Sequence, residues 1–180
     1  QALDSVLMQK RDFPIEICLG EDQSSDGTRE ICQEYAARHP DIIRLFLRDR
    51  ADPARKQYAA PFMYNSIETI KACRGEYIAL LEGDDYWTDP DKLRLQLEFL
   101  DAHPGYSLCY HKMARLDQST GRLEVVELGV KGDTVGIGEA CRRFPIYTAS
   151  VVLRSAALPR AFPAWFRKVH VGDWPLFFLA

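Results

Sequence analysis

The chain has 180 residues, of which 47% are hydrophobic, and this length and composition fit one globular domain with a sizeable core. Its formal net charge is -3 and charges of both signs are interspersed, so neither nucleic acid nor an anionic membrane is indicated as the main partner. Five widely spaced cysteines, without the paired spacing of zinc sites, predict reduced and mostly buried thiols.

The sequence contains no signal peptide and no apolar run near the ~18 residues of a transmembrane helix. We therefore expect a cytoplasmic protein, either free or at the inner face of the membrane. The chain starts inside an amphipathic helical pattern at residues 3–10 and stops within the apolar segment 172–180, which has no terminating glycine. Both ends look cut, so we expect a piece of a longer protein.

Along the first hundred residues, short apolar runs alternate with stretches of helical spacing. The runs are rich in β-branched residues and end at glycine or acids, while the helical stretches begin at capping residues and end at proline or glycine. We expect strands at 15–20, 42–47 and 76–83, a loop at 48–60, and helices from Ser25 or Asp26 to Pro40, from 61 to 73, and from Thr88–Asp91 to 103–105. The strand at 76–83 is apolar enough to be buried on both faces.

The second half of the chain continues this alternation. We expect strands at 106–111, 121–128 and 147–154, and a last helix that begins near Gly172. The whole pattern predicts an α/β fold with a mainly parallel sheet and helices on both faces. In such sheets ligands bind at the carboxyl ends of the strands, and both acidic clusters of the chain fall there.

The first acidic cluster, Glu21 and Asp22, directly follows the first expected strand. Carboxylates in this place accept hydrogen bonds from a ribose or a nucleobase, and the free N–H groups of the next helix start attract anions. A structural interpretation competes with this one: Ser25 or Asp26 caps the helix, and the two acids are solvated. The residues alone leave both interpretations open.

The second cluster, Glu82, Asp84 and Asp85, lies at the end of the expected strand 76–83. Carboxylates this close repel one another and are stable together mainly when solvated or when they share a cation. Mg²⁺ or Mn²⁺ prefers oxygen ligands and commonly binds through one or two carboxylates plus substrate phosphates. The abrupt change from apolar to acidic residues favours such a metal site over its alternative, a solvated acidic turn.

The segments IEICLGEDQSSDGTREI, RGEYIALLEGDDYWTDPDKLRLQLEFL and GDWPLFFLA stand in this order along the chain. They resemble the nucleotide-binding, metal-binding and acceptor-side segments of family 2 glycosyltransferases with the GT-A fold, and the middle motif is the most specific. The resemblance implies one partial GT-A domain, 1–180, with a nucleotide-sugar and metal half at 15–103 and an acceptor half at 104–180. The family's opening strand and the region beyond its last helix are expected to lie outside this chain.

By this resemblance, Asp22 contacts the base of a nucleotide-sugar, Asp84 binds its ribose, and Asp85 binds Mg²⁺ or Mn²⁺ as in the family's Asp-x-Asp motif. Glu82 stands where many members have aspartate, and its role is left open. The implied donor is a nucleoside-diphosphate sugar, a UDP- or dTDP-sugar. The implied acceptor is a glycan, a lipid-linked glycan or a protein, in polysaccharide or cell-envelope biosynthesis.

Asp173, in VGDWPLF, matches the acidic residue that serves as general base in the same family. The acceptor hydroxyl must lose its proton as it attacks the anomeric carbon from the face opposite the departing nucleoside diphosphate, so the configuration inverts. The metal neutralises the charge that develops on the diphosphate. Capping of the last helix is the structural alternative for Asp173, and one residue can serve both purposes.

For several other residues a structural interpretation is favoured over a functional one. They are Arg48, Arg50, Arg55 and Lys56 as solvated loop residues, Asn65 as a packing or surface residue, and His111 and His170 as structural or exposed histidines. Two pairs are left undecided: Tyr86-Trp87, as a wall of the sugar pocket or a staple of the next helix, and Thr148 with Ser150, as acceptor-side or ordinary strand residues.

Two alternatives to a glycosyltransferase stay open. A sugar nucleotidyltransferase has a related sheet and uses Mg²⁺ and nucleotide sugars, but such enzymes carry a glycine-rich N-terminal loop that this sequence lacks. A non-enzymatic, receiver-like α/β module binds a cation through acids at strand ends. It also needs a phosphoacceptor aspartate and a partner lysine on later strands, which we cannot place, and it leaves Asp173 unexplained.

Overall fold

The structure is a computed structural model, and it describes residues 1–127, 132–143 and 146–180. It divides into two compact units that are interleaved along the chain. The strand-pair unit comprises Asp12–Ile78 and Leu158–Leu179, and the acidic-turn unit comprises Gln1–Arg11, Ala79–Ala157 and Ala180. The two units are described separately below.

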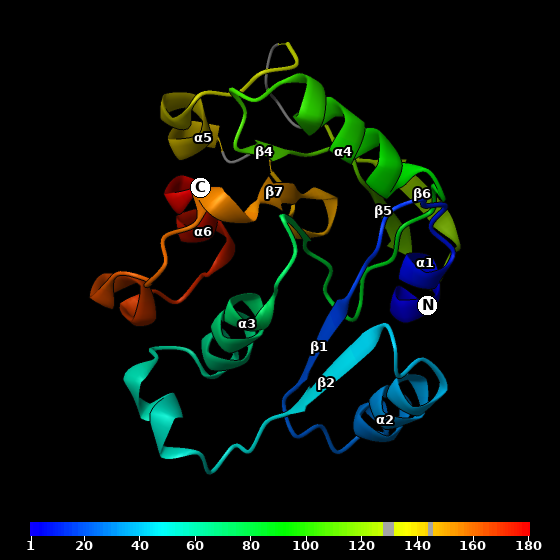
Figure 1. Ribbon diagram of the computed structural model, residues 1–180, viewed down its shortest axis with the longest axis vertical. Helices are drawn as coiled ribbons and strands as arrows, with labels where there is room; N and C mark the ends of the chain where they lie inside the picture. Colours follow the sequence, from blue (N-terminus) through cyan, green and yellow to red (C-terminus); the bar gives the residue numbers. More distant parts are fainter. Residues whose placement is uncertain (128–131, 144–145) are drawn as a thin grey trace. The chain divides into compact units, whose positions relative to one another are not determined.

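The strand-pair unit holds a parallel two-stranded sheet with a helix on either side. Its elements are β1 (Ile17–Glu21), α2 (Thr28–Arg38), β2 (Ile43–Leu47), the 3-10 helix η1 (Pro53–Gln57), α3 (Pro61–Ala72), the 3-10 helix η4 (Ala164–Lys168) and α6 (Asp173–Leu179). Figure 1 shows β1 and β2 side by side between α3 and α2. The register pairs Glu21 with Leu47, so both strands end at the same edge, where Asp22 and Arg48 follow them.

Two glycines allow close approaches to α3. Asn65 on α3 donates its Nδ2 to the carbonyl oxygen of Gly20 in β1 at 3.0 Å, and a Cβ at position 20 would overlap Asn65 and Thr69. A Cβ at position 172 would lie 2.6 Å from Sδ of Met63, which is buried on α3. Because no larger residue fits either place, these contacts fix α3 against the sheet and against the start of α6.

The acidic-turn unit is built from short strands and one long helix. Its elements are α1 (Ala2–Leu7), the end of β3 (Tyr77–Ala79), α4 (Lys92–Ala102), β4 (Leu108–Cys109), β5 (Ala114–Asp117), β6 (Arg122–Val125), α5 (Ile137–Arg143), the 3-10 helix η2 (Thr148–Ser150), β7 (Val152–Arg154) and the 3-10 helix η3 (Ser155–Ala157). The sheet order is β3-β7-β4, and β4 runs antiparallel to β7. Figure 1 shows α4 alongside β4. Leu93 and Leu100 of α4 are buried and belong to the core.

The predicted α/β fold class is confirmed, and so is the parallel pairing of the first two strands around a helix. Two antiparallel pairs, β4 with β7 and β5 with β6, were not predicted. β6 lies within the strand predicted at 121–128, but its partner β5 was not predicted, so the hairpin was missed. Every residue of the two strands except Leu116 is exposed, so no buried face distinguishes them. Gly121 turns this hairpin with a φ of 70°, a conformation that suits glycine.

Two predictions around the acidic cluster are wrong in extent. The strand expected at 76–83 is only β3, and it is not buried on both faces, since Ile78 is buried but Ala79 is exposed. The helix expected from Thr88–Asp91 begins at Lys92. Oδ1 of Asp89 accepts the backbone N–H of Asp91 at 2.8 Å, and this side-chain turn keeps the intervening proline outside the helix.

Three predicted strands of the second half are also too long. Residues 106–111 give only β4. Of 147–154, the first part forms η2 and only the last three residues form β7. Of 121–128, the structure has β6, and residue 128 lies outside the described residues. The apolar composition identified segments that contain strands, but it could not predict where ladder hydrogen bonds stop or that residues 148–150 form a 3-10 helix.

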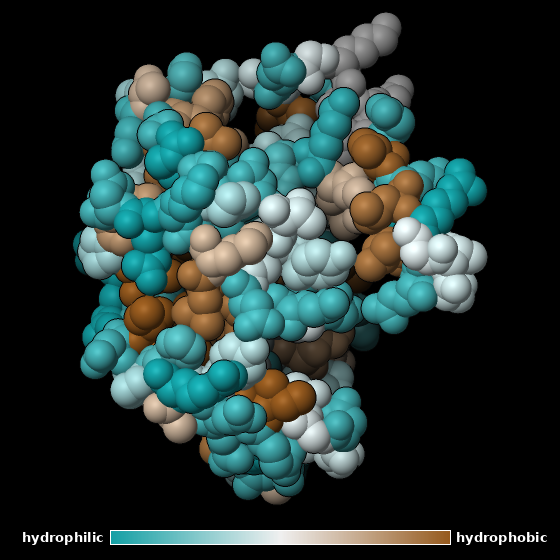
Figure 2. Space-filling model, turned by 90° about the vertical axis from the view of Figure 1, so that its right-hand side faces the viewer, coloured by the Kyte–Doolittle hydropathy of each residue, from teal (hydrophilic) through white to brown (hydrophobic). Residues whose placement is uncertain are grey.

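The five cysteines are free, as predicted, but fewer are buried than expected: Cys32 is buried, Cys141 is exposed, and the other three are half-buried. In the described ranges no helix is long and apolar enough to cross a membrane. Figure 2 shows one face of the molecule, on which hydrophobic residues form separate patches among hydrophilic ones.

Candidate functional site

The first acidic residue after β1 has a structural role. Glu21 is buried, and its Oε1 accepts a hydrogen bond from the backbone N–H of Ser24 at 2.5 Å. Its Oε2 lies 3.5 Å from Nε of Arg29 on α2, an ion pair that offsets the cost of burying the charge. Glu21 therefore shapes the turn after β1, and the interpretation of this residue as a solvated acid is wrong.

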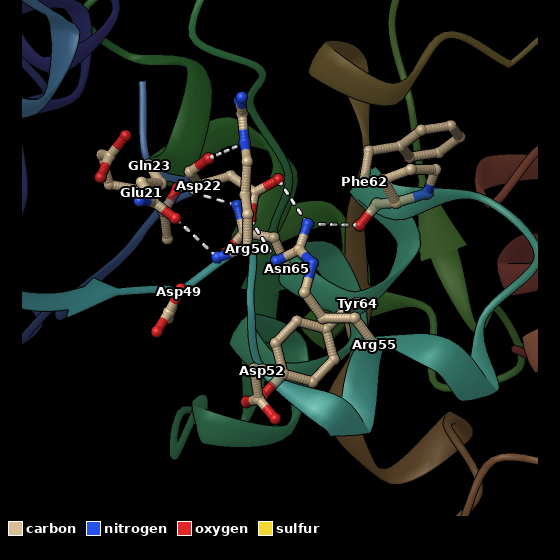
Figure 3. Close-up of polar contacts among 12 residues, drawn as sticks. Glu21, Asp22, Gln23, Asp49, Arg50, Asp52, Arg55, Phe62, Tyr64 and Asn65 are labelled. Carbon is tan, nitrogen blue, oxygen red and sulfur yellow. Dashed lines mark hydrogen bonds and ion pairs between the residues drawn. The ribbon is translucent and has the colours of Figure 1, made fainter. Parts of the chain in front are cut away.

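Asp22 is held by a bidentate ion pair with Arg55 of η1 (Figure 3). Arg55 Nη1 donates to Asp22 Oδ1 at 2.6 Å, and Nη2 donates to Oδ2 at 2.8 Å and to the carbonyl oxygen of Pro61 at 3.0 Å. The hydrogen bond to Asp22 raises the pKa of Arg55. Arg55 is only 9% exposed, so its prediction as a solvated loop residue is wrong: a guanidinium can be buried when a carboxylate pairs with it.

The ring of Tyr64 supports two arginines. The guanidinium of Arg55 lies 5.1 Å from the ring centroid, that of Arg48 lies 5.8 Å from it, and the Tyr64 hydroxyl donates to Asp52. Arg48 also lies 5.2 Å from the ring centroid of Phe46 and is half-buried, so the prediction of a solvated Arg48 is wrong as well. Within the described ranges, Nε and Nη2 of Arg48 are buried without a hydrogen-bond partner.

Arg50 and Lys56 behave as predicted, since both are exposed. Arg50 nevertheless contacts the strand end. Its Nε donates to the backbone carbonyl of Asp22 at 2.8 Å, and its backbone N–H donates to Oε1 of Gln23 at 2.7 Å (Figure 3). Gln23 has a φ of 57°, in the left-handed region that a residue other than glycine seldom adopts, and these two bonds accompany that strained turn. Asn65 packs against Gly20, which is the structural role favoured for it.

The second cluster forms a tight turn in which the backbone N–H of Asp85 donates to the carbonyl of Glu82 at 3.3 Å. Asp84 is exposed and Asp85 is half-buried. Burial, and then the negative charge of Asp84, raise the pKa of Asp85. Among the ion pairs of the described residues, none joins a basic side chain to Asp84 or Asp85. The two carboxylates are therefore crowded without a cationic side chain beside them.

The donor chemistry of this turn suits a hard divalent cation. Over the part of the chain that the structure covers, no group of three or more His, Cys, Asp or Glu side chains is arranged to hold a metal ion, so the protein builds no complete cage. Mg²⁺ and Mn²⁺ need none, because they are commonly held by one or two carboxylates together with substrate phosphates and water. The carboxylates of Asp84 and Asp85 have the chemistry of that second kind of site, and burial together with the charge of Asp84 raises the pKa of Asp85.

Trp87, two residues after the turn, is buried, and its indole Nε1 donates to the carbonyl of Ala149 at 2.7 Å. Nζ of Lys92 lies 4.1 Å from the Trp87 ring centroid and donates to Oε1 of Gln96 at 2.6 Å. Burial lowers the pKa of Lys92 to about 7, although the indole face attracts the charged ammonium. Trp87 thus packs beneath α4, which supports the interpretation as a staple of the next helix.

Lys92 and Gln96 were missed by the sequence analysis, which assigned the buried stripe of this helix to leucines. The available signal was their spacing: they are one helical turn apart and share a face with Leu93 and Leu100. His111 is half-buried, burial lowers its pKa, and its Nδ1 contacts the backbone carbonyl of Lys112 at 2.7 Å, in agreement with the structural role favoured for it.

Asp173 is the first residue of α6 and is half-buried. Its Oδ1 accepts the backbone N–H of Trp174 at 2.9 Å. The expected capping position, just before the helix, is thus wrong by one residue. A Cβ at position 172, directly before Asp173, would lie 2.6 Å from Sδ of Met63, so the chain before α6 packs closely against α3.

Of the undecided acceptor-side pair, Ser150 is 1% exposed and its Oγ donates to the carbonyl of Tyr147 at 2.6 Å, so its hydroxyl is committed to the fold. Thr148 is half-buried at the start of η2. The four predicted site residues are divided between the units: Asp84 and Asp85 belong to the acidic-turn unit, and Asp22 and Asp173 belong to the strand-pair unit. Their roles stay predictions.

An α/β fold with acidic residues after its strand ends is typical of proteins that bind a ligand at that edge of the sheet. The sequence profile described as Glycosyl transferase family 2 matches residues 1–125, more than half of the chain. The chain belongs to that family, and its α/β fold agrees with the expected GT-A architecture. A glycosyltransferase domain therefore accounts for most of these residues, and neither alternative class is needed.

Individual relatives agree with this. An uncharacterised protein of Mycobacterium tuberculosis is 43% identical over 177 residues, which cover 98% of this chain and 48% of the relative. The Bacillus subtilis protein EpsE, whose name contains the word glycosyltransferase, is 30% identical over 133 residues, 73% of this chain and 41% of the relative. The dTDP-rhamnosyl transferase RfbG of Shigella flexneri is 28% identical over 102 residues, 56% of this chain and 32% of the relative. The chain thus spans about half the length of the mycobacterial protein.

Proposed function

We propose that this protein is an inverting, metal-assisted glycosyltransferase that moves a sugar from a nucleoside-diphosphate sugar to an acceptor hydroxyl. The observation that carries the proposal is the acidic turn. Asp84 and Asp85 lie next to each other, the pKa of Asp85 is raised by burial and by Asp84, and both fall inside the stretch that matches the family. Crowded carboxylates of this kind are stabilised by a divalent cation that they share with a diphosphate.

In the proposed reaction the acceptor oxygen forms a bond to the anomeric carbon while the bond between that carbon and the diphosphate oxygen breaks. The proton of the acceptor hydroxyl passes to the carboxylate of Asp173, the general base, and the nucleoside diphosphate departs with the electron pair of the broken bond. Attack from the opposite face inverts the configuration. A cation bound through Asp85 would neutralise the charge on the leaving diphosphate, and Asp84 would bind the ribose.

Asp22 is proposed to receive the nucleobase, and its pairing with Arg55 supports this role. The bidentate contact fixes the carboxylate in one orientation, which leaves lone pairs of both oxygens to accept N–H groups of a base. The name of the Shigella relative supports a dTDP-sugar as one donor to test, and UDP-sugars are the other. A glycan, lipid-linked or protein acceptor in polysaccharide or cell-envelope biosynthesis completes the proposal.

A cytoplasmic location is part of the same proposal. The five cysteines are free, which suits a reducing compartment, and nucleotide-sugars are the substrates assumed here. The oxidation state of the cysteines in protein isolated from its native source would test this location independently of the activity. Reduced thiols would support it, and disulfides would contradict it.

The test uses the full-length protein with a panel of UDP-, dTDP- and GDP-sugars, Mn²⁺ and candidate acceptors, and it measures release of nucleoside diphosphate. We expect release that needs one donor class and that is lost in Asp85→Ala and in Asp173→Asn, with Asp41→Asn, an exposed aspartate outside the proposed site, as the matched control. Release of pyrophosphate from a nucleoside triphosphate and a sugar phosphate, or turnover that survives Asp85→Ala, would refute the proposal.

A further inference from the structure

Three consecutive backbone carbonyls, at residues 149–151, lie directly before β7 in the acidic-turn unit; we call them the carbonyl run. Each accepts a hydrogen bond from the polypeptide around the acidic turn at 82–85. The bonds are Leu80 N to the carbonyl of residue 151 at 3.2 Å, Trp87 Nε1 to that of residue 149 at 2.7 Å, and Gln96 Nε2 to that of residue 150 at 2.9 Å. The acidic turn is thus anchored on both sides to one short segment.

The two anchoring side chains, Trp87 and Gln96, are buried and make specific contacts. Trp87 is buried, with Lys92 over its ring. Gln96 is also buried, and besides the carbonyl run its Nε2 donates to the carbonyl of Cys109 at 3.1 Å, while its Oε1 accepts from Lys92. Because both donor side chains are buried, removing one of them would leave a buried or half-buried carbonyl without that partner, which is costly.

The anchors restrain a turn that carries two neighbouring carboxylates, those of Asp84 and Asp85. Like charges this close in one tight turn repel each other. Without its anchors, a six-residue loop from 81 to 86 could separate the two groups by backbone rotation. With Leu80 and Trp87 at its two ends bonded to the carbonyls of residues 151 and 149, the loop has fewer conformations available.

We propose that Trp87 and Gln96 are positioning residues that hold Asp84 and Asp85 in place for a divalent cation and a nucleoside diphosphate. The inference rests on the proposed function of those two aspartates. Neither side chain touches the reacting groups; each acts through the backbone of the carbonyl run. Loss of a supporting hydrogen bond around a metal site commonly weakens metal binding by about 10- to 100-fold.

The test is Trp87→Phe in the full-length protein, which removes the indole N–H and keeps an aromatic ring beneath Lys92. Trp165→Phe, at an exposed tryptophan, is the matched control. Electron paramagnetic resonance of free Mn²⁺ in the presence of UDP gives the metal affinity, and calorimetry with UDP alone gives metal-free nucleotide binding. We expect Mn²⁺ affinity to fall about 10-fold in Trp87→Phe, metal-free UDP binding to stay within about 2-fold, and the control to match the wild type.

Gln96→Glu is the second variant, because a carboxylate cannot donate to the carbonyl run, and it should weaken Mn²⁺ binding in the same way. It tests the inference even if Trp87→Phe fails to fold. Wild-type Mn²⁺ affinity in a folded Trp87→Phe or Gln96→Glu protein, with only thermal stability reduced, would overturn the positioning role. If instead wild-type protein binds Mn²⁺ and UDP no better than Asp85→Ala does, both the proposed function and this inference fail. If metal binding needs Asp85 but is unchanged in Trp87→Phe, only the inference is refuted.

Discussion

The acids at the end of β1 and those of the acidic turn look alike in sequence, yet they are treated in opposite ways. At the end of β1, Glu21 has Arg29 and Asp22 has Arg55, so each negative charge is compensated within the fold. In the acidic turn, the pKa of Asp85 is raised by burial and by Asp84. We infer from this difference that carboxylates paired with arginine suit recognition of neutral hydrogen-bond donors. Crowded carboxylates without a basic partner suit a cation.

The largest expected effect is on the rate. Asp85→Asn should lower kcat/KM about 1000-fold, because a metal-bound diphosphate stabilises several kcal/mol of developing charge in the transition state. Steady-state release of nucleoside diphosphate measures this loss, with Asp41→Asn as the control. A fall of less than tenfold would mean that the two acidic regions do not differ in function as proposed.

The next prediction concerns Lys92, a buried basic residue of the acidic-turn unit. Burial lowers the pKa of Lys92 to about 7 in the folded state, against about 10.4 unfolded, so between these values the unfolded chain binds more protons. The free energy of unfolding should therefore rise as pH rises from 7 to 10, by roughly 2 to 4 kcal/mol from this group. Below pH 7 the cost of burying the charged amine is present in full.

Urea unfolding of the wild type and of Lys92→Met at pH 6, 8 and 9.5 isolates that contribution. The difference in stability should favour Lys92→Met at pH 6 and shrink steadily with increasing pH. Equal differences at all three pH values would show that Lys92 keeps its charge at each of them, stabilised by the ring of Trp87. The acidic-turn unit would then contain a buried cationic side chain.

At the other acidic region, the ion pair itself can be measured. Arg55→Met leaves a partly buried Asp22 unpaired, and Asp22→Asn leaves a buried guanidinium unpaired, so each should lower the free energy of unfolding by about 2 to 3 kcal/mol. A double-mutant cycle should give a coupling energy near 2 kcal/mol. The exposed pair of Arg38 and Glu34 provides the comparison, with an expected coupling below about 0.5 kcal/mol. Equal couplings would show that Asp22 and Arg55 are no better paired than surface charges.

The smallest effect is on stability in the presence of metal. Mn²⁺ with UDP, at ten times its dissociation constant, should raise the free energy of unfolding of the wild type by about 1.4 kcal/mol. Asp85→Asn should show no such increase in the free energy of unfolding, while Arg55→Met should keep the increase that depends on the metal. Thermal unfolding with and without EDTA reports both results, and a metal response in Asp85→Asn would place the cation elsewhere.

Much of this fold could be predicted from the sequence because the apolar runs of β1 and β2 and the helical spacing of α2 are local patterns, although the N-cap of α2 is Gly27 and not the expected Ser25 or Asp26. The acidic cluster could also be located, since the step from apolar Leu81 to Asp84 is visible in the sequence, but its strand was expected to reach residue 83 and ends at Ala79. The pairing of Asp22 with Arg55 could not be, because the two are 33 residues apart and a basic loop residue is usually solvated. Long-range partners of charged residues are set by tertiary packing, on which periodicity carries no information.

The buried polar residues of α4 illustrate the same limit. Lys92 and Gln96 occupy core positions that a rule based on hydrophobicity assigns to leucine, and their hydrogen bonds to each other and to the carbonyls of Cys109 and Ser150 make these positions acceptable. Asp173 shows a smaller discrepancy: its helix was predicted near Gly172 and begins at Asp173 itself.

The burial of Trp87 also provides an optical probe. The chain has three tryptophans, and Trp165 and Trp174 are exposed, so their indole emission lies at longer wavelength than that of a shielded ring. In a protein carrying Trp165→Phe and Trp174→Phe, the remaining fluorescence would come from the residue that anchors the acidic turn. Its wavelength and lifetime would then report, in real time and without a label, whether that turn moves when a cation and a nucleotide arrive.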